Sequence, residues 1–159
     1  MRGLVLFALV TGLCLHTAAG AGEAEVSNTL DEFHAAAARG DSEAYFAVMT
    51  DAVVFLGTDA TERWQGQAFR KFVLEHFGEG RGWTYTPGAR HIDMAPGGKW
   101  AFFDELLQHD RLGQCRGSGV LVREGDAWKI AQYNLSVPVP NAIVLDVAGQ
   151  IRALPAPNP

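Results

Sequence analysis

The stretch of sequence that decides the fold lies near the end of the chain, and it reads Trp128-Lys129-Ile130-Ala131-Gln132-Tyr133-Asn134-Leu135-Ser136. Because side chains alternate between the two faces of a strand, this stretch predicts one face with Trp128, Gln132 and Asn134, and an opposite face with Tyr133 and Leu135. Neither face looks solvated. We therefore expect the two amides to be enclosed, where an unpaired amide costs about 1 to 3 kcal/mol. The stretch predicts a strand that borders a concave pocket.

The second half of the chain has the pattern of further antiparallel strands. Turn sequences rich in glycine, proline and polar residues separate its apolar runs at residues 87–88, 96–98, 111–113 and 124–126. Strands of this length joined so tightly form a meander. This half therefore predicts one bent antiparallel sheet.

The first half has the spacing of helices. Val26, Leu30, Phe33 and Ala37 recur at helical intervals, and the run ends at Gly40. Asp41 or Ser42 can cap a second helix, a short strand follows at residues 52–56, and a third helix begins near residue 65. Helices first and a sheet second predict an α+β domain. After the sheet, Asn141 can cap a final helix, for which a further strand is the alternative.

The first 21 residues have the pattern of a secretory signal peptide. Arg2 is followed by an apolar run and then by small residues, and cleavage after Ala19 or Ala21 fits that pattern. A membrane anchor is the alternative, but the run is shorter than the roughly 20 residues that a spanning helix needs. We therefore expect an exported protein, periplasmic or secreted, with a single domain at residues 22–154 and a frayed tail at 155–159.

Composition excludes several classes of partner. The net charge is −5 and no cluster of lysine or arginine is present, so we expect no nucleic-acid partner and no binding to anionic lipid. Because the signal peptide is expected to be removed, we also expect no membrane anchor in the mature protein. Cys14 lies in the signal peptide, which leaves Cys115 alone and allows no internal disulfide. Histidines and acids are too scattered for a metal site, and we predict no cofactor.

Four stretches together resemble the nuclear transport factor 2-like superfamily in its SnoaL-like branch. They lie in the same order along the chain, at residues 57–66, 100–105, 115–121 and 128–140. The resemblance implies a cone, in which a strongly curved antiparallel sheet wraps around helices, with a pocket in the open end and frequent homodimers through the sheet. Members of the superfamily include isomerases, dehydratases, polyketide cyclases and modules with no catalytic role, so the fold alone does not choose among these activities.

The candidate catalytic residues are Asp104, Glu105 and His34. Asp104 and Glu105 are adjacent on a predicted strand, so one of them points inward and needs a partner. Arg116, on the following strand, is the cation we expect; the register that selects between the two acids stays open. An ion pair that orients the sheet and a pocket with a catalytic base are the two interpretations. His34 lies on the apolar stripe of the first helix, either as a core residue or as a proton carrier.

The candidate ligand-binding residues divide into aromatic and polar groups. We expect Tyr45, Trp64, Phe102 and Trp128 to supply contact area, and Arg116, Gln132 and Asn134 to fix polar groups. Asp59 and Glu62 either cap a turn or line the pocket, where the resemblance places their loop. The leading hypothesis is a domain that binds a small molecule and transfers a proton next to a carbonyl; the alternative is a non-catalytic module for dimerisation or protein interaction.

Overall fold

The computed structural model describes residues 16–155, so most of the expected signal peptide and the last four residues lie outside the described part of the chain. The elements follow one another in the order helices, sheet, helix. They are α1 (His16–Arg39), α2 (Ser42–Ala47), β1 (Met49–Leu56), β2 (Arg63–Gln65), α3 (Gln67–Gly78), β3 (Thr86–Met94), β4 (Trp100–His109), β5 (Gly113–Glu124), β6 (Ala127–Ser136) and α4 (Val144–Ala153).

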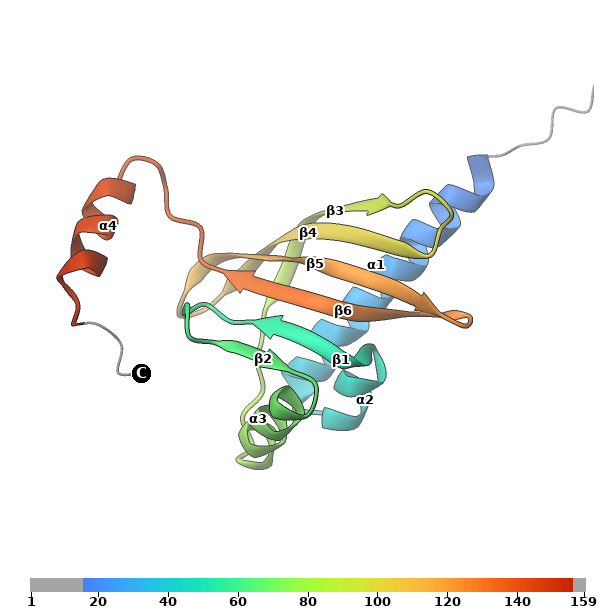
Figure 1. Cartoon of the computed structure of the whole chain (residues 1–159), viewed down its shortest axis with the longest axis horizontal. Coiled ribbons are helices and arrows are strands. Elements are labelled where there is room, and N and C mark those ends of the chain that lie inside the picture. Colours follow the sequence, from blue (N-terminus) through green and yellow to red (C-terminus); the bar gives the residue numbers. More distant parts are fainter. Residues whose placement is uncertain (1–15, 156–159) are drawn as a thin grey trace, which may run out of the picture.

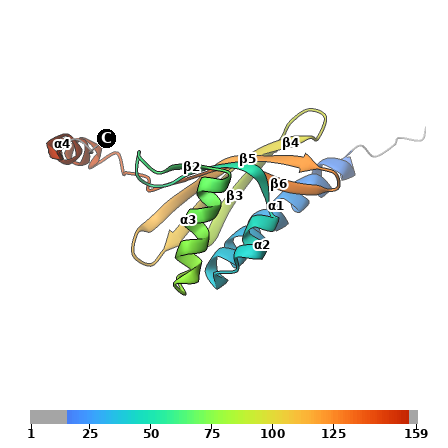
Figure 2. The same cartoon turned by 60° about the horizontal axis from the view of Figure 1, so that its bottom comes forward.

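One curved sheet of six strands holds the domain together. Its order is β2-β1-β6-β5-β4-β3, and every neighbouring pair is antiparallel except β1 and β6. Helices α1, α2 and α3 lie together on one side of this sheet (Figures 1 and 2). The predicted α+β cone and the meander from β3 to β6 are confirmed.

The helical half folds as its apolar spacing predicts. Val26, Leu30, Phe33 and Ala37 are all buried, so the stripe of α1 faces the core. Gly40, with φ of 64°, ends the helix in the left-handed conformation that glycine adopts without strain. Asp41 then caps α2 by accepting the backbone N–H of Ala44 at 3.1 Å.

A β-bulge in β6 changes which side chains face the core. Gln132 pairs with Val120 while Ile130 pairs with Leu121, so Ala131 is an extra residue on its strand. Trp128 and Ile130 are buried before the bulge, and Tyr133 and Leu135 are buried after it. The alternation that predicted Gln132 and Asn134 on the inner face is therefore wrong, because it assumed an unbroken period of two.

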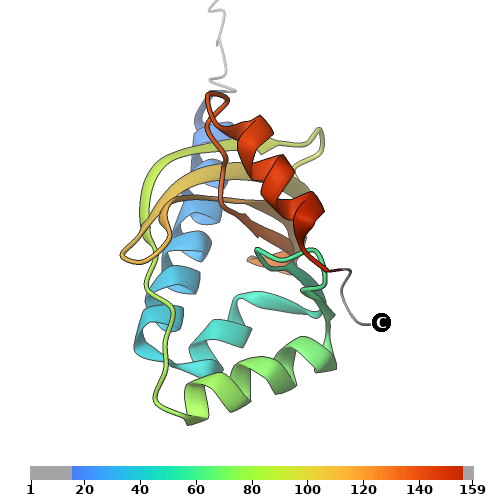
Figure 3. The same cartoon turned by 90° about the vertical axis from the view of Figure 1, so that its left-hand side faces the viewer.

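The last helix has almost no contact with the rest of the domain. No residue of α4 is buried, and an extended segment carries it beyond the end of the sheet (Figure 1), so that α4 lies in front of the sheet in Figure 3. A helix forms here rather than the alternative strand. It begins after Ile143, with no side-chain hydrogen bond at its N-terminus, so the expected cap by Asn141 is wrong. None of the helices in residues 16–155 is long and apolar enough to cross a membrane.

Candidate functional site

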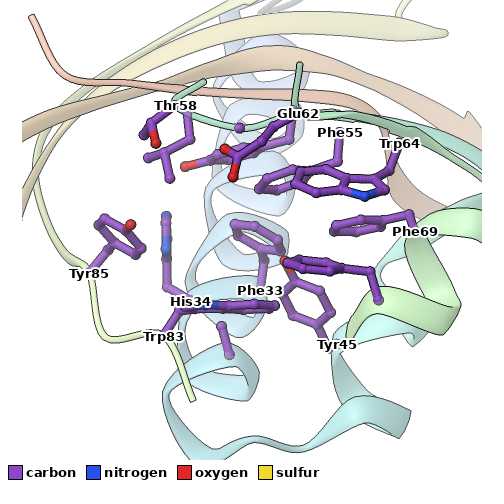
Figure 4. Close-up of a pocket in the computed structure, with 15 residues that line it drawn as sticks. Phe33, His34, Tyr45, Phe55, Thr58, Glu62, Trp64, Phe69, Trp83 and Tyr85 are labelled. Carbon is purple, nitrogen blue, oxygen red and sulfur yellow. The ribbon is translucent and has the colours of Figure 1, made fainter. Parts of the chain in front are cut away.

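A cavity of about 180 Å³ opens between the three N-terminal helices and the sheet. Aromatic side chains from seven parts of the chain form most of its wall (Figure 4). The lining residues are Phe33, His34, Ala37, Tyr45, Phe55, Gly57, Thr58, Glu62, Trp64, Phe69, Phe72, Trp83, Tyr85, Tyr133 and Leu135.

Stacked rings hold the wall in place. Phe55 of β1 stacks on Phe69 of α3 with ring centroids 4.6 Å apart, and on its cross-strand neighbour Tyr133 at 5.5 Å. Trp64 of β2 stacks on Phe72 of α3 at 4.4 Å. These contacts join the sheet to α3, so the cavity has a largely preformed shape.

Glu105 lies fully buried beside the cavity, on the inner face of β4. Its Oε1 contacts His34 Nε2 at 2.6 Å and accepts the Tyr133 hydroxyl at 3.1 Å. Its Oε2 accepts Arg90 Nε at 2.8 Å and lies 2.7 Å from the second guanidinium nitrogen, NH2. Both oxygens of this carboxylate therefore have partners on three other elements.

Arg90 is held in turn by α1. Its NH1 donates to the hydroxyl of Ser27 at 2.8 Å, to the carbonyl of Ser27 at 3.1 Å and to Asp31 at 2.8 Å. Because Arg90 is directly opposite Glu105 in the sheet, a cross-strand pair of β3 and β4 fixes the orientation of the carboxylate.

The surroundings of Glu105 keep it ionised. Burial raises the pKa of this carboxyl, but the hydrogen bonds and charges of His34 and Arg90 outweigh burial and lower the pKa below its usual value. The pKa of Arg90 is raised: burial lowers it, but the charge of Glu105 and the bonds to Asp31 and Glu105 prevail. Burial and the charge of Glu105 raise the pKa of the Tyr133 hydroxyl, which stays a donor.

When the His34 ring is neutral, the ionised Glu105 determines which of its two nitrogens carries the proton. A carboxylate only accepts hydrogen bonds, so His34 donates Nε2–H to it, and Nδ1 then carries the lone pair. Nδ1 has no hydrogen-bond partner among residues 16–155, and the ring borders the cavity. The geometry thus presents a basic nitrogen, oriented by a buried carboxylate, to whatever occupies the cavity.

The Tyr45 hydroxyl is a second polar group in the cavity wall. Tyr45 is 1% exposed, and its hydroxyl has no hydrogen-bond partner in the described part of the chain. Burial is the main cause, and Tyr85 the second, of a pKa for this hydroxyl well above the ordinary tyrosine value of 10.0. Tyr45 therefore stays protonated and can donate a hydrogen bond into the cavity.

Of the residues predicted from the sequence, His34, Tyr45, Glu62 and Trp64 line the cavity. Glu105 does not line it but contacts His34 directly. The sequence left the choice between Asp104 and Glu105 open, and the structure places Glu105 inward and leaves Asp104 exposed on the outer face.

The remaining predicted residues lie elsewhere. Arg116 is exposed and is paired with Leu106, on the opposite face from Glu105, so its expected pairing with the acid is wrong. Phe102 is 46% exposed on the same outer face. Trp128 is buried in the core with its indole N–H on Glu25 at 3.1 Å.

Three polar residues are also outside the cavity. Gln132 and Asn134 face outward after the bulge, and Asn134 borders only a shallower groove. Asp59 accepts the backbone and hydroxyl groups of Thr61 at 2.8 and 2.6 Å, which is the turn-capping alternative. The bond from the Thr61 side chain also lowers the pKa of Asp59.

Sequence reasoning missed Arg90, Tyr133 and several of the lining rings. Arg90 could have been found as the cation on the strand before Glu105, but a register shift between Pro87 and Arg90 hides the pairing. Tyr133 was expected on the outer face because the bulge was not foreseen. In the described part of the chain, no group of three or more histidine, cysteine or acidic side chains could hold a metal ion.

Comparisons with known proteins agree with this architecture. The family profile for the SnoaL-like domain matches residues 26–140. The chain covers 99% of a candidate dehydratase of the nuclear transport factor 2-like family from Streptomyces avermitilis, with 76% of this chain matched, 13% identity and a TM-score of 0.65. A candidate scytalone dehydratase from Novosphingobium aromaticivorans is 13% identical, with a TM-score of 0.64. The match covers 87% of that chain and 76% of this chain.

A further similar structure is a nuclear transport factor 2-like protein of unknown function from Pseudomonas putida. It is 17% identical, with a TM-score of 0.64, 77% of this chain covered and 90% of that chain. No match was found among curated proteins. At these identities the structural likeness shows the fold alone.

Proposed function

The chain belongs to the SnoaL-like domain family, and from this premise we propose that its cavity binds a small, mainly apolar molecule with which His34 exchanges a proton. The observation that carries the proposal is the 2.6 Å contact between His34 Nε2 and the buried Glu105. This contact orients the ring and leaves Nδ1 toward the cavity, which is the arrangement that a catalytic base needs.

Proton transfer next to a carbonyl is the reaction that requires the fewest groups, namely one base and one hydrogen-bond donor. His34 Nδ1 takes a proton from the carbon beside the carbonyl, and the resulting imidazolium is stabilised by Glu105. The Tyr45 hydroxyl donates a hydrogen bond to the oxygen on which negative charge develops. The proton then returns from His34 to the same carbon, which inverts or exchanges that position, or to the γ-carbon of a conjugated dienolate, which moves the double bond; both outcomes balance without any other reactant.

The experiment uses 1-indanone, a bicyclic aromatic ketone, as the probe. We expect the protein to accelerate exchange of its α-protons with deuterium in D₂O, measured by NMR, and His34→Gln to reduce the accelerated rate by about 100-fold or more. His91→Gln, on an exposed residue of β3, is the matched control. Equal exchange rates for the protein and His34→Gln, with 1-indanone bound by both, would remove the proton-transfer role.

A non-catalytic interaction module is the second candidate, favoured by the outer surfaces. Trp100 and Phe102 are 45% and 46% exposed on the outer sheet face, and Leu145 and Ile151 of α4 are 81% and 61% exposed. A homodimer through the sheet would cover the first pair. Sedimentation of the protein and of Phe102→Asp tests it, and an unchanged molecular mass would contradict it.

We also infer export to the periplasm or medium from the first 21 residues. Mass spectrometry of protein recovered from its own host tests this. A mature N-terminus at Gly20 or Gly22 is the expected result, and retention of Met1 and Arg2 contradicts it.

A further inference from the structure

The charges around the cavity are not balanced. Its lining contains no lysine or arginine, Glu62 is its only acid, and its one basic side chain, His34, already contacts the carboxylate of Glu105. Glu105, behind the wall, does not add to this excess because Arg90 compensates its charge. The cavity therefore combines many aromatic rings with one acid at its mouth.

The Glu62 carboxylate has little to compensate it. Its Oε2 accepts the backbone N–H of Asp59 at 3.2 Å, and no cationic side chain of residues 16–155 forms an ion pair with it. Figure 4 shows the carboxylate directed toward the labelled rings on the far side of the cavity. A half-buried carboxylate with a single hydrogen bond retains capacity for a cation.

The backbone at Gly57 directs this side chain. A Cβ at position 57 would lie 2.2 Å from Glu62 Oε2 and 2.9 Å from Glu62 Cβ, so only glycine lets the carboxylate occupy this place. Gly57 also donates its backbone N–H to the Glu62 carbonyl at 2.8 Å. The end of β1 and the start of β2 thus hold Glu62 at the mouth of the cavity.

The neighbouring rings favour the same charge as Glu62 does. Tyr85 and Trp64 line the cavity with Glu62. A ring face attracts a cation where no other ring covers it, and one face of Trp64 is covered by Phe72. Glu62 also affects Tyr85, another residue of the cavity wall. The pKa of the Tyr85 hydroxyl is raised mainly by burial, and to a smaller extent by Cys115 and by the charge of Glu62. An anion would meet an uncompensated carboxylate here and would lose its water without gaining a partner.

We propose that the cavity selects organic cations, with a protonated amine or quaternary ammonium group paired with Glu62 and with the apolar part of the ligand among the rings. This inference rests on the proposed binding function but is independent of proton transfer by His34. A cationic ligand is opposite in charge to the ligand that Arg116, expected in the pocket from the sequence, would attract.

Three probes with the same ring and different charge test the inference: benzylamine, benzyl alcohol and benzoate at pH 7. A cavity of about 150 Å³ holds a benzene ring, so each probe is of suitable size. Binding is measured by chemical-shift titration of the ¹⁵N-labelled protein. We expect benzylamine to bind most tightly, about tenfold more tightly than benzoate, with benzyl alcohol between them.

Two variants assign this preference to Glu62. Glu62→Gln should bring the affinities of benzylamine and benzoate within about threefold of each other. The control Glu124→Gln, at the exposed last residue of β5, should keep the tenfold difference. Gly57→Ala displaces the carboxylate but retains its charge, so it should lower the affinity for benzylamine and leave the affinity for benzyl alcohol unchanged.

The outcomes separate this inference from the proposed function. If benzoate binds as tightly as benzylamine, or if Glu62→Gln keeps the preference, cation selection is wrong while the cavity still binds ligands. If none of the three probes shifts the signals of residues in the cavity, both the binding function and the selectivity are contradicted. The rate of 1-indanone exchange in His34→Gln tests proton transfer only and does not test cation selection.

Discussion

Two glutamates serve the same cavity in opposite surroundings. Glu105 is fully buried, and His34, Tyr133 and Arg90 occupy both of its oxygens. Glu62 lies half-buried at the mouth with one backbone hydrogen bond. The difference shows that burial and pairing, and not residue type, decide whether an acid supports the structure or remains available to a ligand.

The largest expected effect is on stability, from Glu105→Ala. It leaves the Arg90 guanidinium, 10% exposed, without its main anionic partner and the Tyr133 hydroxyl without an acceptor. We expect a loss of about 3 to 5 kcal/mol in the free energy of unfolding, measured by urea denaturation. The matched variant Glu62→Ala should lose about 1 kcal/mol or less. Similar losses for the two variants would contradict the contrast between the glutamates.

The second expected effect is a dependence of stability on pH. Because the pKa of Glu105 is lowered on folding, its contribution is present above the carboxyl's unfolded pKa of about 4.3 and is lost as pH falls through the lower folded value. Glu105→Gln should therefore lose less stability than the unmodified protein between pH 5 and pH 3, measured by urea denaturation. Parallel curves for Glu105→Gln and the unmodified protein would contradict the lowered pKa of Glu105.

A smaller effect is expected from Gly117→Ala. Gly117 is opposite Glu105, and a Cβ there would lie 2.1 Å from the Tyr133 hydroxyl and 3.0 Å from Glu105 Oε1. We expect a loss of about 1 to 3 kcal/mol, since the Tyr133 ring must shift within a packed core. Gly88→Ala, whose added Cβ would make ordinary contact at 3.5 Å, is the control in the same denaturation series. A neutral Gly117→Ala would show that the Tyr133 contact tolerates displacement.

The smallest effect is expected at the residues that the sequence placed in the cavity and the structure places outside it. Gln132→Ala and Asn134→Ala should each change the free energy of unfolding by about 0.5 kcal/mol or less and leave benzylamine affinity unchanged. Tyr133→Phe, between them on the strand, removes the bond to Glu105 and should cost about 1.5 kcal/mol. Benzylamine affinity that falls severalfold in Asn134→Ala would contradict the outward orientation after the bulge.

Local patterns in the sequence were sufficient for most of the fold. The stripe of Val26, Leu30 and Phe33, the stop at Gly40 and the cap at Asp41 each depend on neighbours within a turn or two, so spacing alone predicts them. The turns of the meander have the same local origin. The inward orientation of one acid of the Asp104 and Glu105 pair also followed from strand alternation.

The rest of the site depends on contacts between distant strands. Arg90 contacts Glu105 through a register that a shift in β3 alters, and the sequence carries no local sign of that shift. Trp83 and Tyr85 reach the cavity from a segment that a backbone bond from Trp83 N–H to the Ala37 carbonyl, 3.0 Å long, ties to α1. The extra residue in β6 reversed the predicted face of Tyr133 and Asn134 together.

The Ala131 bulge has a consequence for comparing relatives of this protein. A homologue that lacks the additional position would need a one-residue gap at Ala131 when the two sequences are aligned. If the gap is set a few positions later, Asn134 of this chain is matched to a side chain that faces inward in the relative. Functional assignments should therefore be transferred between such proteins from superposed strands. A sequence alignment with a misplaced gap matches residues that line the cavity to residues on the outer face.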